Sequence, residues 1–322
     1  MSEVRRDPFD DPARRAVLDR HRVRREHLLG RGGEAHVYAL DPERVLRLHR
    51  NPDHHASAAY IRRIGAFYDT LDRGAVPFAL PEVLEVQEED VTWSIERRLP
   101  GRPFDALLAG LSGHDRTTAI TAYVDGAAAF GGLGVPDGFG DGVGELFTEE
   151  ELRTSTWAEL LEARLVLQLE RGAHVLRDRV PDLDRAAARV TALARAEKAL
   201  GRTLVHGDFF PGNVLLGDDL EVSAVIDLGW LTVVGDASHD VRSAVAFWSV
   251  RPWAKPGERE ALVAAATRHL GPDAGPMLER TERFEQARFA FVAEDPHLFA
   301  WCVDGLRSLA DDRSGTVPGD GS

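Results

Sequence analysis

The segment Leu-Val-His-Gly-Asp-Phe-Phe-Pro-Gly-Asn-Val-Leu-Leu occupies residues 204–216, and Ala-Val-Ile-Asp-Leu-Gly follows at residues 224–229. Four residues separate Asp208 from Asn213, and Asp227 ends an apolar run 19 residues after Asp208. An aspartate, then an asparagine, then a second aspartate is the order of base and metal ligands in kinase-type phosphoryl transfer. The spacing therefore indicates a definite chemistry.

The three side chains suit that chemistry individually. An aspartate at position 208 can hydrogen-bond a substrate hydroxyl and orient it toward the γ-phosphorus, because a loose transition state rewards positioning. The amide oxygen of Asn213 and the carboxylate of Asp227 are hard ligands that suit Mg²⁺. Each residue alone would also fit a turn or a cap, but together, joined by a two-strand ribbon predicted over 214–226, they favour the chemical interpretation. We interpret His206 as holding the loop through backbone hydrogen bonds rather than as a proton carrier.

The composition restricts the class of protein. The chain has 322 residues, enough for one large or two modest domains, and its formal net charge is −14. This charge argues against a nucleic-acid partner, which needs a basic surface; it suits a cationic substrate but also ordinary solubility. The single cysteine, Cys302, cannot form an internal disulfide, and no apolar run approaches the ~20 residues of a membrane helix. With no apolar leader either, we expect a cytoplasmic protein with no membrane partner, and the oligomeric state stays open.

The order of strand and helix patterns predicts an α+β fold, with a small β-rich lobe followed by a large helical lobe. We expect an N-terminal lobe over 1–99 with a leading helix at 11–27, and a lobe junction at 100–103. A helical C-terminal lobe is expected over 100–310, and a disordered tail over 311–322. The expected strands cover 22–29, 35–40, 44–49, 83–88 and 91–99, and the expected helices cover 56–71, 114–130, 156–177, 183–200, 236–249, 257–269 and 288–310.

The motifs at 206–213 and 226–229 resemble those of the aminoglycoside phosphotransferase family of small-molecule kinases. The resemblance implies a fold similar to that of protein kinases. It implies Asp208 as the catalytic base and Asn213 and Asp227 as Mg²⁺ ligands. It also implies ATP or GTP as the phosphate donor and a hydroxyl of a small molecule as the acceptor.

The amino-terminal half agrees with this resemblance in its order of motifs. Residues 30–37 follow a Gly-x-Gly-x-x-Gly-x-Val pattern in which alanine replaces the third glycine. Backbone amides of such a hairpin can approach a phosphate closely, although a plain hairpin turn would fit equally. Residues 95–101 resemble the hinge of the family, whose backbone holds the adenine edge. The expected nucleotide-binding residues are Gly30, Gly32, Gly33 and Ala35 in the hairpin, and Glu96, Arg97 and Arg98 in the hinge.

The sequence departs from the family pattern at two positions in this half. The third strand usually carries a lysine for the α- and β-phosphates, whereas here it carries Arg47, which can grip phosphate bidentately or simply lie on a surface strand. The family also places a glutamate on the following helix to pair with the strand cation. Residues 51–81 contain no glutamate; Ile64 stands near that position, and Asp69 is a shorter candidate.

Three other segments carry weaker signals. Asp236 suits the N-cap of a helix that starts there, and the resemblance implies that Asp240 braces the catalytic loop from beneath. The glycine-rich segment 131–144 predicts a mobile surface loop rather than a phosphate cradle, because no strand-to-helix context surrounds it. The three histidines within 49–55 match no zinc-ligand spacing, and we interpret them as a solvated loop.

Alternatives to an antibiotic kinase remain open at this point. A protein kinase fits poorly, because only 12 residues lie between Asp227 and Asp240 and no Ala-Pro-Glu follows. Arg47 and the missing helix glutamate suggest a non-catalytic nucleotide-binding module, and a metabolic kinase of a sugar or amino alcohol is equally compatible. Acceptor recognition is implied for 104–175 and 255–310. The acidic residues that could attract an amino sugar, or form a solvated helix face, are Glu279, Glu282, Glu285, Glu294 and Asp295.

Overall fold

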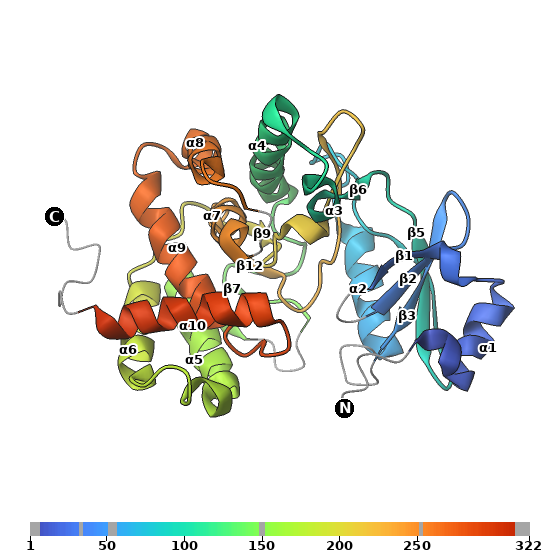
Figure 1. Ribbon diagram of the computed structural model, residues 1–322, viewed down its shortest axis with the longest axis horizontal. Coiled ribbons are helices and arrows are strands. Elements are labelled where there is room, and N and C mark those ends of the chain that lie inside the picture. Colours follow the sequence, from blue (N-terminus) through green and yellow to red (C-terminus); the bar gives the residue numbers. More distant parts are fainter. Residues whose placement is uncertain (1–6, 32–34, 51–56, 148–151, 251–253, 313–322) are drawn as a thin grey trace.

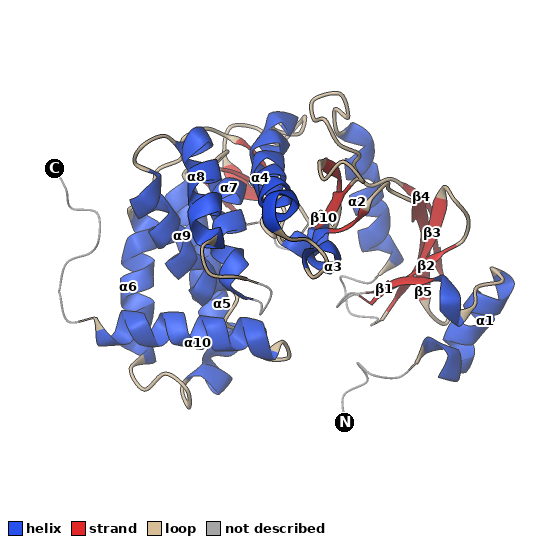
Figure 2. Cartoon of the chain, turned by 45° about the horizontal axis from the view of Figure 1, so that its top comes forward, coloured by secondary structure: helices blue, strands red, loops and turns tan. Residues whose placement is uncertain are grey.

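A small β-rich lobe and a larger helical lobe make up the molecule (Figure 1). The expected α+β, two-lobe architecture is confirmed. Figure 2 shows that most helices belong to the large lobe, whereas the longest strands gather in the small one. The computed structural model describes residues 7–31, 35–50, 57–147, 152–250 and 254–312.

The small lobe is built on a five-stranded antiparallel sheet in the order β1-β2-β3-β5-β4. Leu46 and Leu48 of β3 and Trp93 and Ile95 of β5 lie on one face and pack against helix α1. Since side chains alternate along a strand, the odd-numbered residues of β3 and the even-numbered residues of β5 lie on the opposite face. The strands are β1 (Leu28–Arg31), β2 (Ala35–Ala39), β3 (Arg44–His49), β4 (Val83–Glu88) and β5 (Thr92–Arg97).

Two helices accompany this sheet, α1 (Pro12–Arg20) and α2 (Ala58–Thr70). Asp11 caps α1 by accepting a hydrogen bond from the Arg14 amide, with a proline in the first turn. The expected helix over 11–27 and strand over 22–29 are both wrong in extent. Arg22 has a φ of +54°, a left-handed conformation that stops a helix, and the chain forms a 3₁₀ turn before β1.

The two lobes are joined by a short strand, β6 (Arg102–Pro103), which pairs with β10 (Val214–Leu216). Strand β10 pairs in turn with β11 (Val222–Val225), so the expected ribbon forms and lies against the lobe junction. Gly101 has a φ of +97°, and a β-carbon there would lie 2.1 Å from the Ser223 hydroxyl. Only glycine fits this junction.

The large lobe contains helices packed around a second small sheet, in the order β8-β7-β12-β9. The sequence did not predict this sheet, whose strands have only two or three residues. The single helix expected over 288–310 is wrong. One helix ends at Arg288, and a second begins at Pro296 with Asp295 as its N-cap. The elements are α3 (Phe104–Leu108), α4 (Gly113–Phe130), β7 (Val143–Glu145), β8 (Arg153–Thr154), α5 (Trp157–Leu176), α6 (Leu183–Arg195), β9 (Thr203–Val205), β12 (Val233–Gly235), α7 (His239–Ala246), α8 (Glu258–Leu270), α9 (Ala274–Arg288) and α10 (Pro296–Asp311).

Two apolar clusters hold the large lobe together. The first joins α2 of the small lobe to α3, α4, α7 and α8 and includes Phe209 and Leu228. The second joins α5, α6, α9 and α10 and includes Val205 and, at its edge, Phe210. The segment after β9 therefore crosses from one cluster to the other, which fixes its path.

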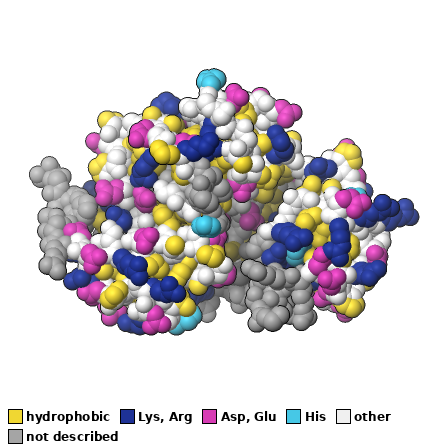
Figure 3. Space-filling model, viewed as in Figure 1, with side chains coloured by type: hydrophobic (Ala, Val, Ile, Leu, Met, Phe, Trp, Pro, Cys, Tyr) yellow, Lys and Arg dark blue, Asp and Glu magenta, His cyan; other side chains and the backbone are white. Residues whose placement is uncertain are grey.

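The surface and the helix lengths add two observations. On the face drawn in Figure 3, acidic and basic side chains are interspersed. Among the residues that the structure describes, no helix is both long and apolar enough to cross a membrane.

Candidate active site

The loop between β9 and β10 carries the first two predicted site residues, and a glycine makes its turn possible. Gly207 has a φ of +76°, and a β-carbon there would lie 2.2 Å from the Leu231 carbonyl oxygen. Phe209 is fully buried, and the Tyr123 hydroxyl donates to its carbonyl at 2.5 Å. The loop ends in a 3₁₀ turn over Pro211–Asn213. Its course is set by a tight turn and an apolar anchor.

Asp240 and His206 hold this loop from beneath. The buried Asp240 carboxylate accepts hydrogen bonds from the amides of His206 (2.7 Å) and Gly207 (3.0 Å). The Nδ1 atom of His206 accepts from the Asp208 amide at 3.2 Å, so Nε2 carries the proton and donates to the Ile226 carbonyl at 2.9 Å. The imidazole of His206 thus ties the loop to the residue that precedes Asp227.

Asp208 and Asn213 are in direct contact across the loop. The Asn213 Nδ2 group donates to the Asp208 carboxylate at 3.1 Å and to the Asp208 carbonyl at 3.0 Å. Its Oδ1 atom is therefore the amide atom left for a cation. The Ile226 amide donates to the Asn213 carbonyl at 2.9 Å, so the residue before Asp227 is bound to Asn213 as well as to His206.

The two aspartates differ in environment. The pKa of Asp208 is raised to about 6, chiefly by burial and in part by the nearby Asp227 carboxylate, against the opposing effects of His206 and Arg288. The Asp227 side chain keeps 44% of its surface exposed, and its backbone adopts a φ of +69°, which is uncommon for a residue other than glycine. Asp208 is thus a carboxyl that can take up a proton near neutral pH, and Asp227 is a carboxylate that solvent and ions can reach.

The oxygen donors fit a magnesium site. Mg²⁺ prefers one or two protein oxygens and keeps several waters, which matches one amide oxygen and one exposed carboxylate. Among the described residues no group of three or more histidine, cysteine, aspartate and glutamate side chains could hold a metal, so the predicted ligands Asn213 and Asp227 would have to be completed by waters or phosphate oxygens. The expected histidine loop is wrong at His49, which is buried in β3; His54 and His55 lie outside the described residues.

In the small lobe, Arg47 lies between two carboxylates. Its guanidinium is 3.5 Å from the Glu96 carboxylate and 3.6 Å from the Asp227 carboxylate, so it connects β3 and β5 to the other lobe. On helix α2, Ile64 is buried in the core and Asp69 is exposed, so the expectation that Asp69 replaces the missing glutamate is wrong. The carboxylate beside Arg47 is Glu96.

The hinge differs from its expected form. The amide of Arg97 donates to the Glu82 carbonyl (2.9 Å), and the amide of Arg98 donates to the Glu43 carbonyl (2.7 Å). Both amides are thus bound within the small lobe and are not free to donate to an adenine edge, and the nucleotide-binding role expected for Glu96, Arg97 and Arg98 stays a prediction. The Glu96 side chain, only 11% exposed, is likewise engaged by Arg47 rather than turned to a base.

The expected phosphate hairpin is described only in part. Gly30 lies in β1 opposite Val37, and Ala35 begins β2 opposite His49 of β3. A β-carbon on Gly30 would meet nothing within 4 Å. Gly32 and Gly33 lie outside the described residues.

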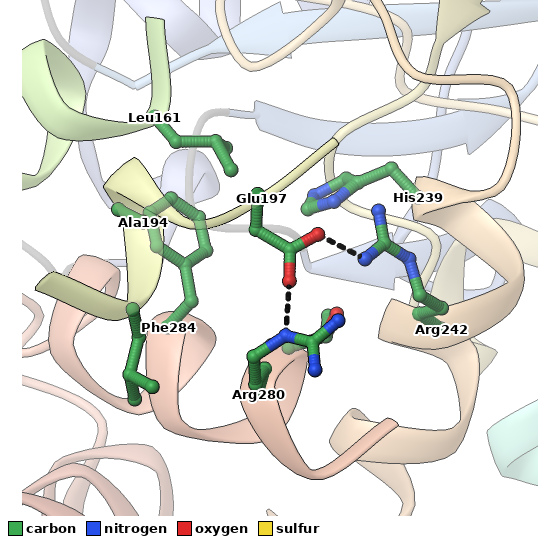
Figure 4. A pocket seen from close by; sticks show the side chains of 9 residues that line it. Leu161, Ala194, Glu197, His239, Arg242, Arg280 and Phe284 are labelled. Carbon is green, nitrogen blue, oxygen red and sulfur yellow. Dashed lines mark hydrogen bonds and ion pairs between the residues drawn. The ribbon is translucent and has the colours of Figure 1, made fainter. Parts of the chain in front are cut away.

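Asp236 does not support the catalytic loop, so that expectation is wrong. Helix α7 starts at His239, after Ser238, and Asp236 instead accepts from the Leu200 amide at 2.8 Å. Its other oxygen pairs with Arg242. In Figure 4 Glu197 lies between Arg242 and Arg280, at distances of 2.6 and 2.8 Å. This buried ionic cluster lies where β12 pairs with the start of β9, whereas the loop follows the end of β9.

Arg288 contacts the loop and was missed in the sequence, and Glu285, which the sequence suggested only as a residue for the acceptor, is its ion-pair partner. The Arg288 guanidinium donates to the Gly207 carbonyl at 2.6 Å and pairs with the fully buried Glu285 at the same distance. Burial alone would raise the pKa of Glu285, but Arg288 and His239 outweigh it and lower the pKa to about 2. The Glu-x-x-Arg spacing on one helix was the available signal, but α9 itself was not predicted.

The acidic residues considered for an amino sugar do not form one site. Glu279 and Glu282 line an outer groove between α8 and α9, where Glu282 pairs with Arg259 at 2.6 Å. Asp295 caps α10 and Glu294 is exposed beside it. Of the five acidic residues, Glu285 is the one whose charge acts on Asp208.

Comparisons with known proteins agree with this geometry. A family model described as the phosphotransferase enzyme family matches residues 27–279. No curated protein matches the chain. Among solved structures, a thermostable mutant of aminoglycoside phosphotransferase APH(4)-Ia is 22% identical, with coverage of 90% of this chain and 94% of that chain and a TM-score of 0.63.

A second similar structure is the streptomycin–ATP complex of APH(2")-IIa, which is 14% identical, with 93% and 96% coverage and a TM-score of 0.61. A third is ADP-bound APH(2'')-Ib, 15% identical, with 88% and 92% coverage and a TM-score of 0.57. At these identities the likeness is one of fold.

Proposed function

Because the chain belongs to the phosphotransferase enzyme family, we propose that it transfers the γ-phosphate of ATP or GTP to a hydroxyl group of a small molecule. The observation that carries the proposal is the linkage of three oxygen-bearing side chains. Asn213 binds the Asp208 carboxylate, and the backbone of Ile226, next to Asp227, binds both Asn213 and His206. This linkage would keep base and metal ligands in one arrangement before any ligand binds, which favours catalysis by positioning.

In the proposed reaction, Asp208 hydrogen-bonds the acceptor hydroxyl and aligns its oxygen with the γ-phosphorus. Its carboxylate takes the hydroxyl proton as the new oxygen–phosphorus bond forms and the bond between the γ-phosphorus and the β–γ bridging oxygen breaks, so that ADP or GDP leaves. A pKa of about 6 suits that task near neutral pH. Asn213 and Asp227 would hold Mg²⁺. When bound, the ion would neutralise charge on the β- and γ-phosphates. Arg47 and the hairpin that includes Gly30 and Ala35 would bind the phosphates from the small lobe.

The acceptor class is the finer part of the proposal. An aminoglycoside is one candidate, since the similar structures include a protein bound to streptomycin. A sugar or amino alcohol with less positive charge is the second candidate, and one observation favours it. Glu285, the acidic residue of the five whose charge acts on Asp208, is already neutralised by Arg288 and His239. We also propose the cytoplasm as the location, because ATP and GTP are available there.

A coupled assay of ADP or GDP release tests this function. The acceptor panel would contain aminoglycosides, macrolides, nucleoside antibiotics, simple sugars and amino alcohols, each with Mg²⁺ and either nucleotide. We expect one class to stimulate nucleotide turnover, and mass spectrometry to find a single added phosphoryl group on that acceptor. A chain that binds magnesium-nucleotide but is stimulated by none of the classes would favour the non-catalytic module instead.

A further inference from the structure

We propose that Glu96 is a positioning residue that orients Arg47 toward the nucleotide phosphates, so that a strand carboxylate replaces the helix glutamate of the family pattern. The inference rests on the proposed function, because it concerns the nucleotide site of that reaction. It assigns to Glu96 a role different from the hinge role expected from the sequence. The reasons lie in the register of the sheet, in a buried hydrogen-bond chain and in the contact with Asp227.

The register of β3 and β5 brings the pair together. Arg47 lies directly opposite Ser94, and Glu96 follows two residues later on the same face of the sheet. The Arg47 and Glu96 charges are 3.5 Å apart, and their side chains are 23% and 11% exposed. A partly buried ion pair of this kind limits the directions in which a long arginine side chain can point.

Two further side chains of that face fix the Glu96 carboxylate. The Ser94 hydroxyl donates to one Glu96 oxygen at 2.9 Å, and the His49 Nε2 atom is 3.3 Å from the same hydroxyl. Burial lowers the pKa of His49 to about 3, so the ring is neutral and donates to Ser94. The chain of donors therefore ends on one oxygen of Glu96 and leaves the other oxygen to Arg47.

Helix α2 carries no carboxylate on its core side. Its residues on the core side are apolar or aromatic, among them Ile61, Ile64 and Tyr68. Its one carboxylate, Asp69, is exposed near the end of the helix. In this part of the chain, Glu96 of β5 supplies a carboxylate that pairs with Arg47.

Arg47 also contacts the other lobe, so the proposal predicts opposite effects of Arg47 on metal binding in the absence and in the presence of nucleotide. Its guanidinium is 3.6 Å from Asp227, which we propose as a metal ligand. A cation at this distance opposes a divalent ion on the same carboxylate. In the absence of nucleotide, Arg47 should therefore weaken metal binding. With nucleotide present, the phosphates attract both the arginine and the metal, and Arg47 should strengthen binding.

Equilibrium binding of a non-hydrolysable ATP analogue with Mg²⁺, measured by calorimetry, tests the positioning role without turnover. We expect Arg47→Gln to weaken binding about thirtyfold and Glu96→Gln about tenfold. The double variant should be no weaker than Arg47→Gln alone, because Glu96 acts through Arg47. Glu89→Gln is the matched control: it removes the same charge from an exposed pair with Arg20 at 2.6 Å in the same lobe, and should bind normally.

Binding of Mn²⁺ alone, followed by electron paramagnetic resonance at low ionic strength, supplies the second measurement. We expect Arg47→Gln to bind the ion about threefold more tightly than the wild type and Glu96→Gln to bind it more weakly. In Arg47→Gln the nucleotide affinity and the ion affinity therefore move in opposite directions, which the loss of a residue that merely supports the fold would not produce. If Glu96→Gln does not fold, Ser94→Ala replaces it, with a smaller loss of nucleotide affinity expected.

Two results would contradict different claims. A wild-type chain that binds no magnesium-nucleotide would overturn the proposed function itself. Normal wild-type binding combined with additive losses in the double variant, or with unchanged binding in a folded Glu96→Gln protein, would overturn this inference alone.

Discussion

The loop at 206–213 in the large lobe and the sheet face that carries Arg47 in the small lobe are held in contrasting ways. The loop is fixed by hydrogen bonds of 2.7–3.2 Å that involve backbone amides or carbonyls, with Asp240 and His206 at their centre. In the small lobe, Arg47 rests on two ion pairs of 3.5 and 3.6 Å. The first region is organised before a ligand binds. The second keeps a charged side chain whose final position depends on a ligand.

The contrast predicts that the largest loss of activity comes from the loop. Asp208→Asn keeps the shape of the side chain but cannot accept a proton, so we expect kcat to fall about a thousandfold. Nucleotide affinity, which we propose to depend on the small lobe and on the metal ligands Asn213 and Asp227, should change little. Steady-state kinetics and calorimetry measure the two quantities. Asp218→Asn, at the exposed turn of the ribbon, is the control, and undiminished turnover in Asp208→Asn would remove that residue from its role.

A substitution of Gly207 tests how much the tight turn of the loop contributes to stability. Gly207→Ala places a β-carbon 2.2 Å from the Leu231 carbonyl at a φ of +76°, and we expect a loss of about 3 kcal/mol or more in unfolding free energy. Gly138→Ala has nearly the same φ, +78°, but no atom within 4 Å, so it should cost only about 1 kcal/mol. Urea denaturation measures both. Equal losses would show that the backbone conformation, not the close approach, dominates.

The pH profile of kcat/KM tests the role of Asp208 in the loop, because it reports the ionisation of groups in the free enzyme. The raised pKa of Asp208, about 6, means that its carboxyl stays protonated to a higher pH than usual. A protonated carboxyl cannot accept the hydroxyl proton, so activity should be present above about pH 6. It should fall about tenfold for each pH unit below that. The residual activity of Asp208→Asn should lack this inflection; a shared inflection would assign it to another group.

The smallest expected effect lies in the small lobe. Arg47→Lys restores the residue of the family pattern and keeps the charge, so we expect the nucleotide KM to change only about threefold. The Arg47→Gln variant should raise it much further. Steady-state kinetics with varied nucleotide checks this, and equal KM values in the two variants would mean that charge at position 47 is unimportant.

The sequence anticipated the loop better than the helices around it. His206, Asp208, Asn213 and the ribbon lie within a short segment, where residue order fixes which atoms can meet. Helix α9 escaped prediction because polar residues occupy its buried side: Glu285, Gln286 and Arg288 are all buried. Their pairing partners come from other elements, so the amphipathic pattern that marks a helix is obscured.

The hinge and Arg47 illustrate a second limit of prediction from the sequence. The sequence pattern predicts that Glu96 lies in the hinge beside the adenine base and that the partner of Arg47 lies on α2. A diagonal pairing between β3 and β5 puts Glu96 beside that arginine instead. Asp236 and Asp240 are only four residues apart, yet Asp240 reaches the loop and Asp236 joins a separate ionic cluster.

Local spacing along the chain was enough to predict the family, the two-lobe architecture and the order of the proposed base and its two proposed metal ligands, because those features depend on neighbouring residues. Partner choice among charged side chains was settled by packing. Such pairs form between distant segments, and each depends on which strands are adjacent and which face is buried. Arg47 with Glu96, Arg288 with Gly207, and Asp236 with Arg242 became visible when the chain folded.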